Sequence, residues 1–136
     1  MRFVDAQRSA FPVALSELKA GEKRSHWMWF IFPQMEGLGF SAMARKYAIR
    51  SRAEAVAYLE HPVLGTRLRE CVDALLRVED RSAREIMGEP DDLKLLSSIT
   101  LFAEVAPGER RFSQLLEKYF QGRRDQRTLD LLQRKD

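Results

Sequence analysis

Apolar residues recur along most of this chain at the three- and four-residue spacing of amphipathic helices. Several polar residues and prolines stand at positions that typically begin such helices. The pattern predicts helices that span residues 2–20, begin at Ser41, Ser51, Pro62, Ser82, Pro90 and Asp125, and include the apolar stripe 112–120. The first of these helices contains Pro12, which is expected to kink it or split it in two.

Two segments, 26–33 and 95–103, lack a polar face. A helix that is apolar all round is buried. Residues 25–32 have the aromatic content of a strand, but no second convincing strand exists for them to pair with, which favours a helix. The sequence therefore predicts an all-α fold: a single multihelical domain over residues 1–136, with two central buried helices wrapped by amphipathic ones.

The composition is that of a globular protein, and it also indicates a cellular location. The 136 residues fit one domain, with 45% apolar and 32% charged residues. The one cysteine, Cys71, is expected to be a buried core residue, and without a signal sequence it indicates a reducing, cytoplasmic location. The longest apolar run is too short to cross a bilayer, so no membrane partner is expected.

The net charge of +3 comes from the C-terminal end. Residues 1–108 carry 15 basic and 15 acidic side chains, whereas residues 109–136 carry 8 and 5. The basic side chains that could contact phosphate are Arg123, Arg124, Arg127, Arg134 and Lys135. A solvated helix surface explains them better, so nucleic acid is not the expected partner, although it remains a third possibility.

The most unusual stretch runs from Lys23 to Gln34, and within it both tryptophans lie between the imidazole of His26 and the carboxamide of Gln34. Trp27 and Trp29 could stack a planar ring, and Gln34 could bind the polar edge of a base or a ribose. His26 could act as an acid or base. The alternatives are a core segment with a hydrogen-bonded histidine, and a glutamine that caps the backbone broken at Pro33.

The second polar set lies on the helix that Pro90 begins. Lys94, Ser97 and Ser98 share one helical face, which could form a pocket wall that meets phosphate or ribose. Asp91 would be a base if there is turnover. The alternatives are close helix packing for the serines and a favourable helix-dipole position for Asp91.

No cofactor or metal is expected, because two histidines and one cysteine give no metal-ligand spacing and no glycine-rich phosphate loop is present. His61 precedes Pro62 at a helix start and is interpreted as structural.

Several stretches of the chain together resemble an uncharacterised bacterial family, the domain of unknown function 1810 family, whose members are often labelled calpastatin-like. The stretches are Arg2-Phe3, Ala6-Gln7, residues 25–34, Gly37-Leu38-Gly39, Tyr47-Ala48-Ile49, residues 61–65 and residues 97–102. The resemblance implies an all-α multihelical domain with two central buried helices, and no established activity. Protease inhibition, which the label implies, is discounted, since calpain inhibitors of that name are disordered. The aromatic–glutamine segment also resembles the N-glycosidase-like family that processes ADP-ribose derivatives, but no full motif carries over.

These observations support two hypotheses. The first is a small protein that binds or processes a nucleotide or ADP-ribose-like molecule in a pocket between the two buried segments, with enzymatic turnover left open. The alternative is a non-catalytic interaction or scaffold module in which the tryptophan segment is core; its protein partner is not identified by the sequence.

Overall fold

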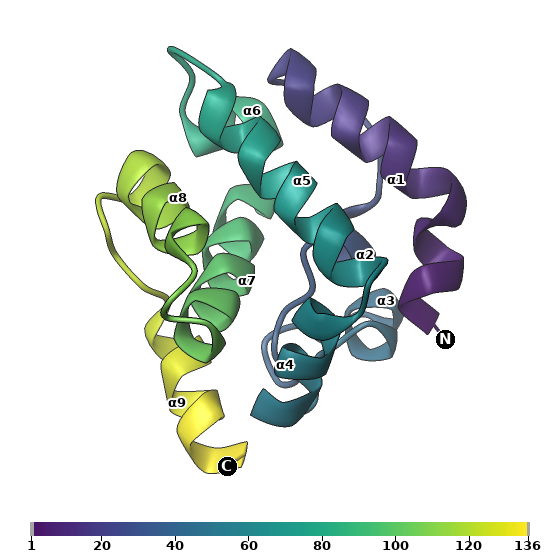
Figure 1. The fold of residues 1–136 in the computed structure, drawn as a ribbon, viewed down its shortest axis with the longest axis vertical. Helices are drawn as coiled ribbons and strands as arrows, with labels where there is room; N and C mark the ends of the chain where they lie inside the picture. The colour runs from purple at the N-terminus through teal and green to yellow at the C-terminus, as the bar shows by residue number, and fades with distance from the viewer. Residues whose placement is uncertain (1, 136) are drawn as a thin grey trace.

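A computed structural model describes residues 2–135 and shows nine helices in that range (Figure 1). The helices are α1 (Arg2–Ala20), α2 (Met28–Ile31), α3 (Ala42–Lys46), α4 (Arg52–Glu60), α5 (Leu64–Arg77), α6 (Ala83–Met87), α7 (Asp91–Val105), α8 (Arg110–Phe120) and α9 (Gln126–Lys135). The β structure of these residues is an isolated parallel bridge between Met35 and Ile49. The predicted all-α fold is confirmed.

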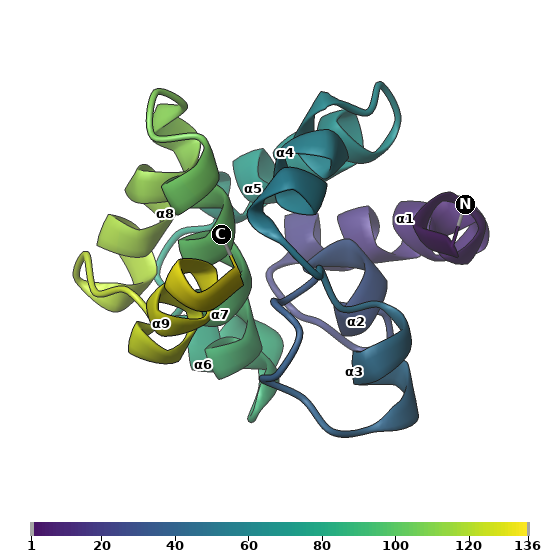
Figure 2. The ribbon, with the colours of Figure 1, turned by 90° about the horizontal axis from the view of Figure 1, so that it is seen from below.

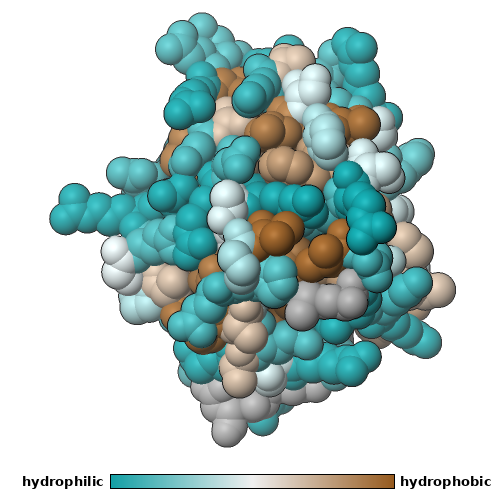
Figure 3. All heavy atoms as spheres, turned by 45° about the vertical axis from the view of Figure 1, so that its right-hand side comes forward, coloured by the Kyte–Doolittle hydropathy of each residue, from teal (hydrophilic) through white to brown (hydrophobic). Residues whose placement is uncertain are grey.

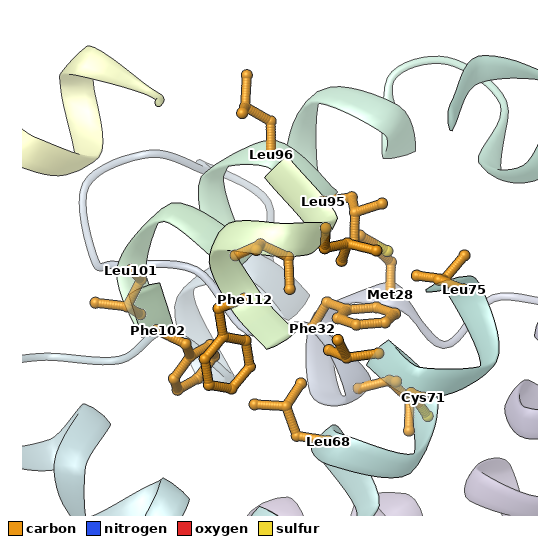
Figure 4. Close-up of a cluster of buried hydrophobic side chains, with 14 of the residues drawn as sticks. Met28, Phe32, Leu68, Cys71, Leu75, Leu95, Leu96, Leu101, Phe102 and Phe112 are labelled. Atoms are coloured by element: carbon orange, nitrogen blue, oxygen red, sulfur yellow. The ribbon is translucent and has the colours of Figure 1, made fainter. Parts of the chain in front are cut away.

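Helix α7 is the centre of the domain. It packs against α4, α6, α8 and α9, while α5 packs against α1, α4 and α8 (Figures 1 and 2). All residues from Leu95 to Ala103 are buried, as the missing polar face predicted. Figure 4 shows how side chains of α2, α5, α7 and α8 meet in this core, with Phe32 and Met28 near Leu95 and Leu75.

The aromatic segment is buried but only briefly helical. The helix expected over 25–32 is reduced to the four residues of α2. Trp27 provides no side-chain cap before it, and Phe32 after it, with φ −122° and ψ 75°, is no longer helical. Pro33 follows with no backbone N–H to continue the helix. His26 is exposed and Trp29 is partly exposed, whereas the other residues from Trp27 to Pro33 are buried.

The predicted caps are present. Ser41, Ser51 and Ser82 each accept a hydrogen bond from the backbone N–H three residues on, and Asp125 accepts one from Thr128 N–H. Glu85 completes a capping box with Ser82. These bonds satisfy donors that a helix N-terminus otherwise leaves unpaired.

One expected helix is shorter than predicted and another is bent rather than split. The helix after Ser41, expected to run to about Ile49, ends at Lys46, because Ile49 N–H donates to Gln34 O at 2.8 Å and Glu36 N–H donates to Ile49 O at 2.8 Å. Helix α1 is not split at Pro12, but its N-terminal part and the rest run in different directions, as a kink would produce (Figures 1 and 2). The carbonyl that loses its intrahelical donor belongs to Arg8, an exposed residue, where water can bond it. Among residues 2–135, no helix combines the length and apolar character needed to span a bilayer.

Candidate functional site

Two lysines share one carboxylate where the segment before α2 meets the first turn of α7. Asp91 Oδ2 lies 2.8 Å from Lys23 Nζ, and Asp91 Oδ1 lies 3.5 Å from Lys94 Nζ. Lys23 also donates to Ser25 O at 2.6 Å, and its side chain is only 7% exposed, whereas that of Lys94 is 31% exposed. The cluster therefore carries one more positive than negative charge, and Lys94 is the ammonium that solvent can reach.

Each of these ammonium groups also faces an indole. Lys23 Nζ lies 4.9 Å from the ring centre of Trp27, and Lys94 Nζ lies 5.7 Å from that of Trp29. Both distances are in the range of cation–π attraction, which contributes about 0.5–2 kcal/mol depending on solvent exposure. Trp29 and Lys94, which the sequence placed on separate polar segments, are thus brought together.

Glu17 of α1 anchors the other tryptophan. Its Oε1 accepts hydrogen bonds from Trp27 Nε1 at 2.9 Å and from the backbone N–H groups of Arg24 and Ser25, while Ser25 Oγ donates to Oε2 at 2.6 Å. Partial burial opposes ionisation, but the bonds from Ser25, Arg24 and Trp27 outweigh it and lower the pKa of Glu17 from 4.5 to about 2.

The two tryptophans therefore have different roles. Trp27 is 1% exposed and its N–H is bonded to Glu17, so its ring is part of the core and is not available to stack a ligand in this arrangement. Trp29 remains partly exposed beside Lys94 and beside a small pocket. Of the two predicted stacking residues, only Trp29 presents a surface.

Gln34 lies in the pocket next to Trp29. Arg45, Tyr47 and the glycines of the 37–39 turn complete the lining. The cavity volume is about 20 Å³, enough for about one water molecule. The backbone C=O of Gln34 accepts from Ile49 N–H, so the backbone of this lining residue is held in place.

The remaining candidates lie apart from this pocket. His26 is exposed. Ser97 Oγ lies 3.2 Å from Leu93 O and 3.1 Å from Asp125 Oδ2, so it joins α7 to the start of α9. Ser98 is completely buried, and its hydroxyl has no hydrogen-bond partner among the described residues. Both serines therefore occupy packing positions, and of the predicted polar face only Lys94 reaches solvent.

The basic C-terminal end is partly neutralised within the fold. Arg124 pairs with Glu104 at 2.8 Å, and Arg123 Nε donates to Phe120 O at 3.3 Å. Arg127 Nη2 lies 3.5 Å from Gly37 O. The side chain of Lys135 lies outside the described residues. In the part of the chain that the structure describes, no three His, Cys, Asp or Glu side chains are grouped to hold a metal ion.

Sequence reasoning gave no role to Lys23, with which the unusual stretch begins, and missed Glu17. Lys23 pairs with the distant Asp91, whereas Glu17 bonds Arg24, Ser25 and Trp27 across the turn that follows α1. The visible signal was the charged pair Lys23-Arg24 directly before the aromatic run, and a glutamate among the apolar positions of 2–20.

The fold and this patch define an all-α protein in which one surface indole lies beside a lysine–carboxylate–lysine cluster. The chain belongs to the family described as Protein of unknown function (DUF1810), whose model matches residues 1–132. It is similar to a solved structure, "Crystal structure of the conserved hypothetical protein Rv1873 from Mycobacterium tuberculosis at 1.38 A". That similarity has 52% identity and a TM-score of 0.95, and covers 97% of this chain and 94% of the other. No curated protein matches the chain.

Proposed function

We propose that the patch formed by Trp29, Lys94 and Gln34 binds a nucleotide or ADP-ribose-like molecule. The observation that carries this proposal is the solvent-accessible Lys94 ammonium beside the partly exposed Trp29 ring. An aromatic ring next to a cation matches a ligand that joins a planar base to a phosphate.

Charge supports an anionic ligand. Asp91 is already bonded to Lys23 at 2.8 Å, and its contact with Lys94 is longer, at 3.5 Å. Lys94 can therefore turn from Asp91 and the indole toward a phosphate at limited cost, and this movement frees the Trp29 ring face for a base. Stacking of one base on an aromatic side chain contributes about 1–3 kcal/mol.

The size of the pocket limits how the ligand is held. The space beside Gln34 accepts about one water molecule, far less than the 300–1,000 Å³ of typical ligand pockets. Only a polar edge of the ligand would enter it, and the base would lie on the surface. We therefore propose binding without turnover, in which Asp91 orients two lysines rather than acting as a base.

Binding can be measured by thermal shift and tryptophan fluorescence with AMP, ADP and ADP-ribose. We expect stabilisation of the native protein, and at least about tenfold weaker binding in Lys94→Met and Trp29→Leu, since each loses about 1–3 kcal/mol of contact. Lys19→Met, which changes an exposed lysine on α1, is the matched control and should bind as the native protein does. The proposal fails if no nucleotide stabilises the protein, or if both site variants bind normally.

A specific observation also favours the interaction-module alternative. Phe40 is 72% exposed and Met43 is 36% exposed, on the turn and helix that also contribute Gly39 and Ala44 to the Trp29 pocket. Contiguous exposed apolar patches mark contact sites, and these two side chains are three residues apart on one short segment. Phe40→Ser should leave nucleotide binding unchanged if the first proposal holds, and should abolish self-association or partner binding if this surface is an interface.

A further inference from the structure

Two arginines of α9 differ from many others in the protein. The face in Figure 3 is covered largely by hydrophilic atoms, with hydrophobic side chains in separate patches, so polarity alone does not single out a site. Arg127 and Arg134 are both exposed, and neither forms an ion pair with another described residue. By contrast, ion pairs join Arg2 to Glu54, Arg69 to Glu109, Arg111 to Asp73 and Arg124 to Glu104.

Arg127 and Arg134 line one groove between α9 and the turn at Gly37. Asp130 and Leu131 complete its described lining. The two arginines are seven residues apart in the helix, so they lie on the same face, with Cα atoms about 10.5 Å apart along the axis. Their long side chains can therefore approach a ligand in the groove from both sides.

The groove favours an anion. Its described lining carries the positive charges of Arg127 and Arg134 and the negative charge of Asp130, whose Oδ1 already accepts from Gln126 Nε2 at 3.0 Å. Arg127 Nη2 lies 3.5 Å from Gly37 O, at the long limit of a hydrogen bond. A guanidinium presents a planar pair of donors that matches two phosphate oxygens. The cavity volume is about 170 Å³, and about 150 Å³ accepts benzene, which is larger than a phosphate group.

The groove adjoins the pocket beside Trp29. Gly37 lines both spaces. Its φ is +106°, and a Cβ at this position would lie 3.3 Å from Leu131 Cδ2, so a glycine lets the turn approach α9 closely. Lys94 lies beside the Trp29 ring and is not on the lining of the groove. Cationic groups therefore stand at two separate places around the indole.

Building on the nucleotide binding proposed above, on which this assignment rests, we propose that the groove between α9 and Gly37 binds a second phosphate group of the same ligand. The preferred ligand is then a nucleotide with phosphates at two separate positions of its ribose, of the nucleoside 3′,5′-bisphosphate class. Its base lies on Trp29, one phosphate meets Lys94, and the other accepts hydrogen bonds from Arg127 and Arg134. A nucleoside diphosphate, whose phosphates are joined to each other, serves only one of these two places.

Calorimetric titration of the full-length protein with AMP, ADP and adenosine 3′,5′-bisphosphate tests this assignment. ADP and the bisphosphate share base, ribose and number of phosphates, and differ in where the second phosphate is attached. The bisphosphate should bind at least about tenfold more tightly than ADP, since a hydrogen bond to a charged group contributes at least about this factor. Equal affinity for AMP, ADP and the bisphosphate overturns the groove assignment alone, whereas no binding of any of them overturns the nucleotide site as well.

Two double substitutions locate the second phosphate. Arg127→Gln/Arg134→Gln should lower the affinity for the bisphosphate to that for ADP, because the groove loses both guanidiniums. Arg77→Gln/Arg110→Gln is the matched control, since it removes the same charge from exposed positions outside the groove, and it should keep the tenfold preference. A preference that survives in the first variant, or is lost equally in both, refutes the assigned site.

Asp130 provides a test of opposite sign. Asp130→Asn removes the negative charge from the lining, while the new side-chain oxygen can still accept from Gln126. The variant should bind the bisphosphate about two- to fivefold more tightly than the native protein does, as expected for one exposed charge. Unchanged or weaker binding of the bisphosphate by a folded Asp130→Asn protein contradicts a phosphate in this groove.

Discussion

The bond between Glu17 and the Trp27 indole gives the sharpest test of how the aromatic segment is held. Trp27 is 1% exposed, so water cannot replace Glu17 as the partner of its N–H. The backbone donors of Arg24 and Ser25 are nearer the surface and can turn to solvent. Glu17→Ala should therefore cost mainly the unpaired indole donor, about 2 kcal/mol in the free energy of unfolding.

A double-mutant cycle isolates this contribution. Trp27→Phe removes the donor, so Glu17→Ala should cost less in that background than in the native protein. We expect a coupling free energy of about 1–2 kcal/mol from urea unfolding at pH 7. Additive effects of the two substitutions would refute the bond as a stabilising contact, because residues that do not interact give no coupling.

The pH dependence provides a second, independent measurement. The pKa of Glu17 is lowered from 4.5 to about 2 in the folded protein, so its stabilising contribution is present above pH 4.5 and is lost as the pH falls toward 2. The full difference corresponds to about 3.4 kcal/mol, and solvent screening of a partly buried group reduces this to about 1–2 kcal/mol. Glu17→Gln should be less stable than the native protein by this amount at pH 7.

The difference between these two proteins should then disappear as the pH approaches 2, because a protonated Glu17 and a glutamine carry the same charge. Unfolding curves collected at intervals from pH 7 to pH 2 measure this convergence, and the other titrating groups cancel in the comparison. A stability gap that is absent at pH 7, or constant over the whole range, contradicts the assignment.

Three further substitutions or reactions test other contacts. Ser98→Ala removes a buried hydroxyl that has no partner among the described residues, and should raise the free energy of unfolding by about 1 kcal/mol in urea melts; destabilisation would show that the hydroxyl is bonded. Burial, with a smaller contribution from Glu70, raises the pKa of Cys71 to about 12, so thiol reagents should label it only on the timescale of unfolding. Lys118 Nζ donates to the carbonyls of Leu76 and Val78 at the end of α5, and Lys118→Met should lower stability by about 1 kcal/mol, with unchanged melts as the contrary result.

The helices were predictable because their determinants are local. The Ser82–Glu85 capping box and the Asp125 cap depend on residues three apart, which the sequence shows directly. The uninterrupted apolar run 95–103 likewise required a buried position whatever packs around it. The end of α3 was not predictable, because the bond from Ile49 N–H to Gln34 O comes from another part of the chain.

The different environments of Trp27 and Trp29 could not be predicted from the sequence. Both indoles have the same hydropathy and stand two residues apart. What separates them is the position of Glu17 on α1 and of Lys94 on α7, which only the packing of those helices determines. Ser97 and Ser98 shared a helical face with Lys94, but depth within the fold, rather than the face, decides which of them reaches solvent.

The aromatic segment is held at two points, and these two contacts determine where Trp29 lies. Glu17 holds the Trp27 indole in the core, and Asp91 holds Lys23 over the same ring. With α2 only one turn long, these anchors leave little freedom for Trp29, which emerges next to Lys94. A polar anchor built solely for stability would not require a second indole at the surface beside a solvent-accessible ammonium. Glu17 and Asp91, which stabilise the core, therefore also position the patch proposed to bind a ligand. Glu17→Ala should weaken binding at Trp29, although Glu17 does not contact the ligand.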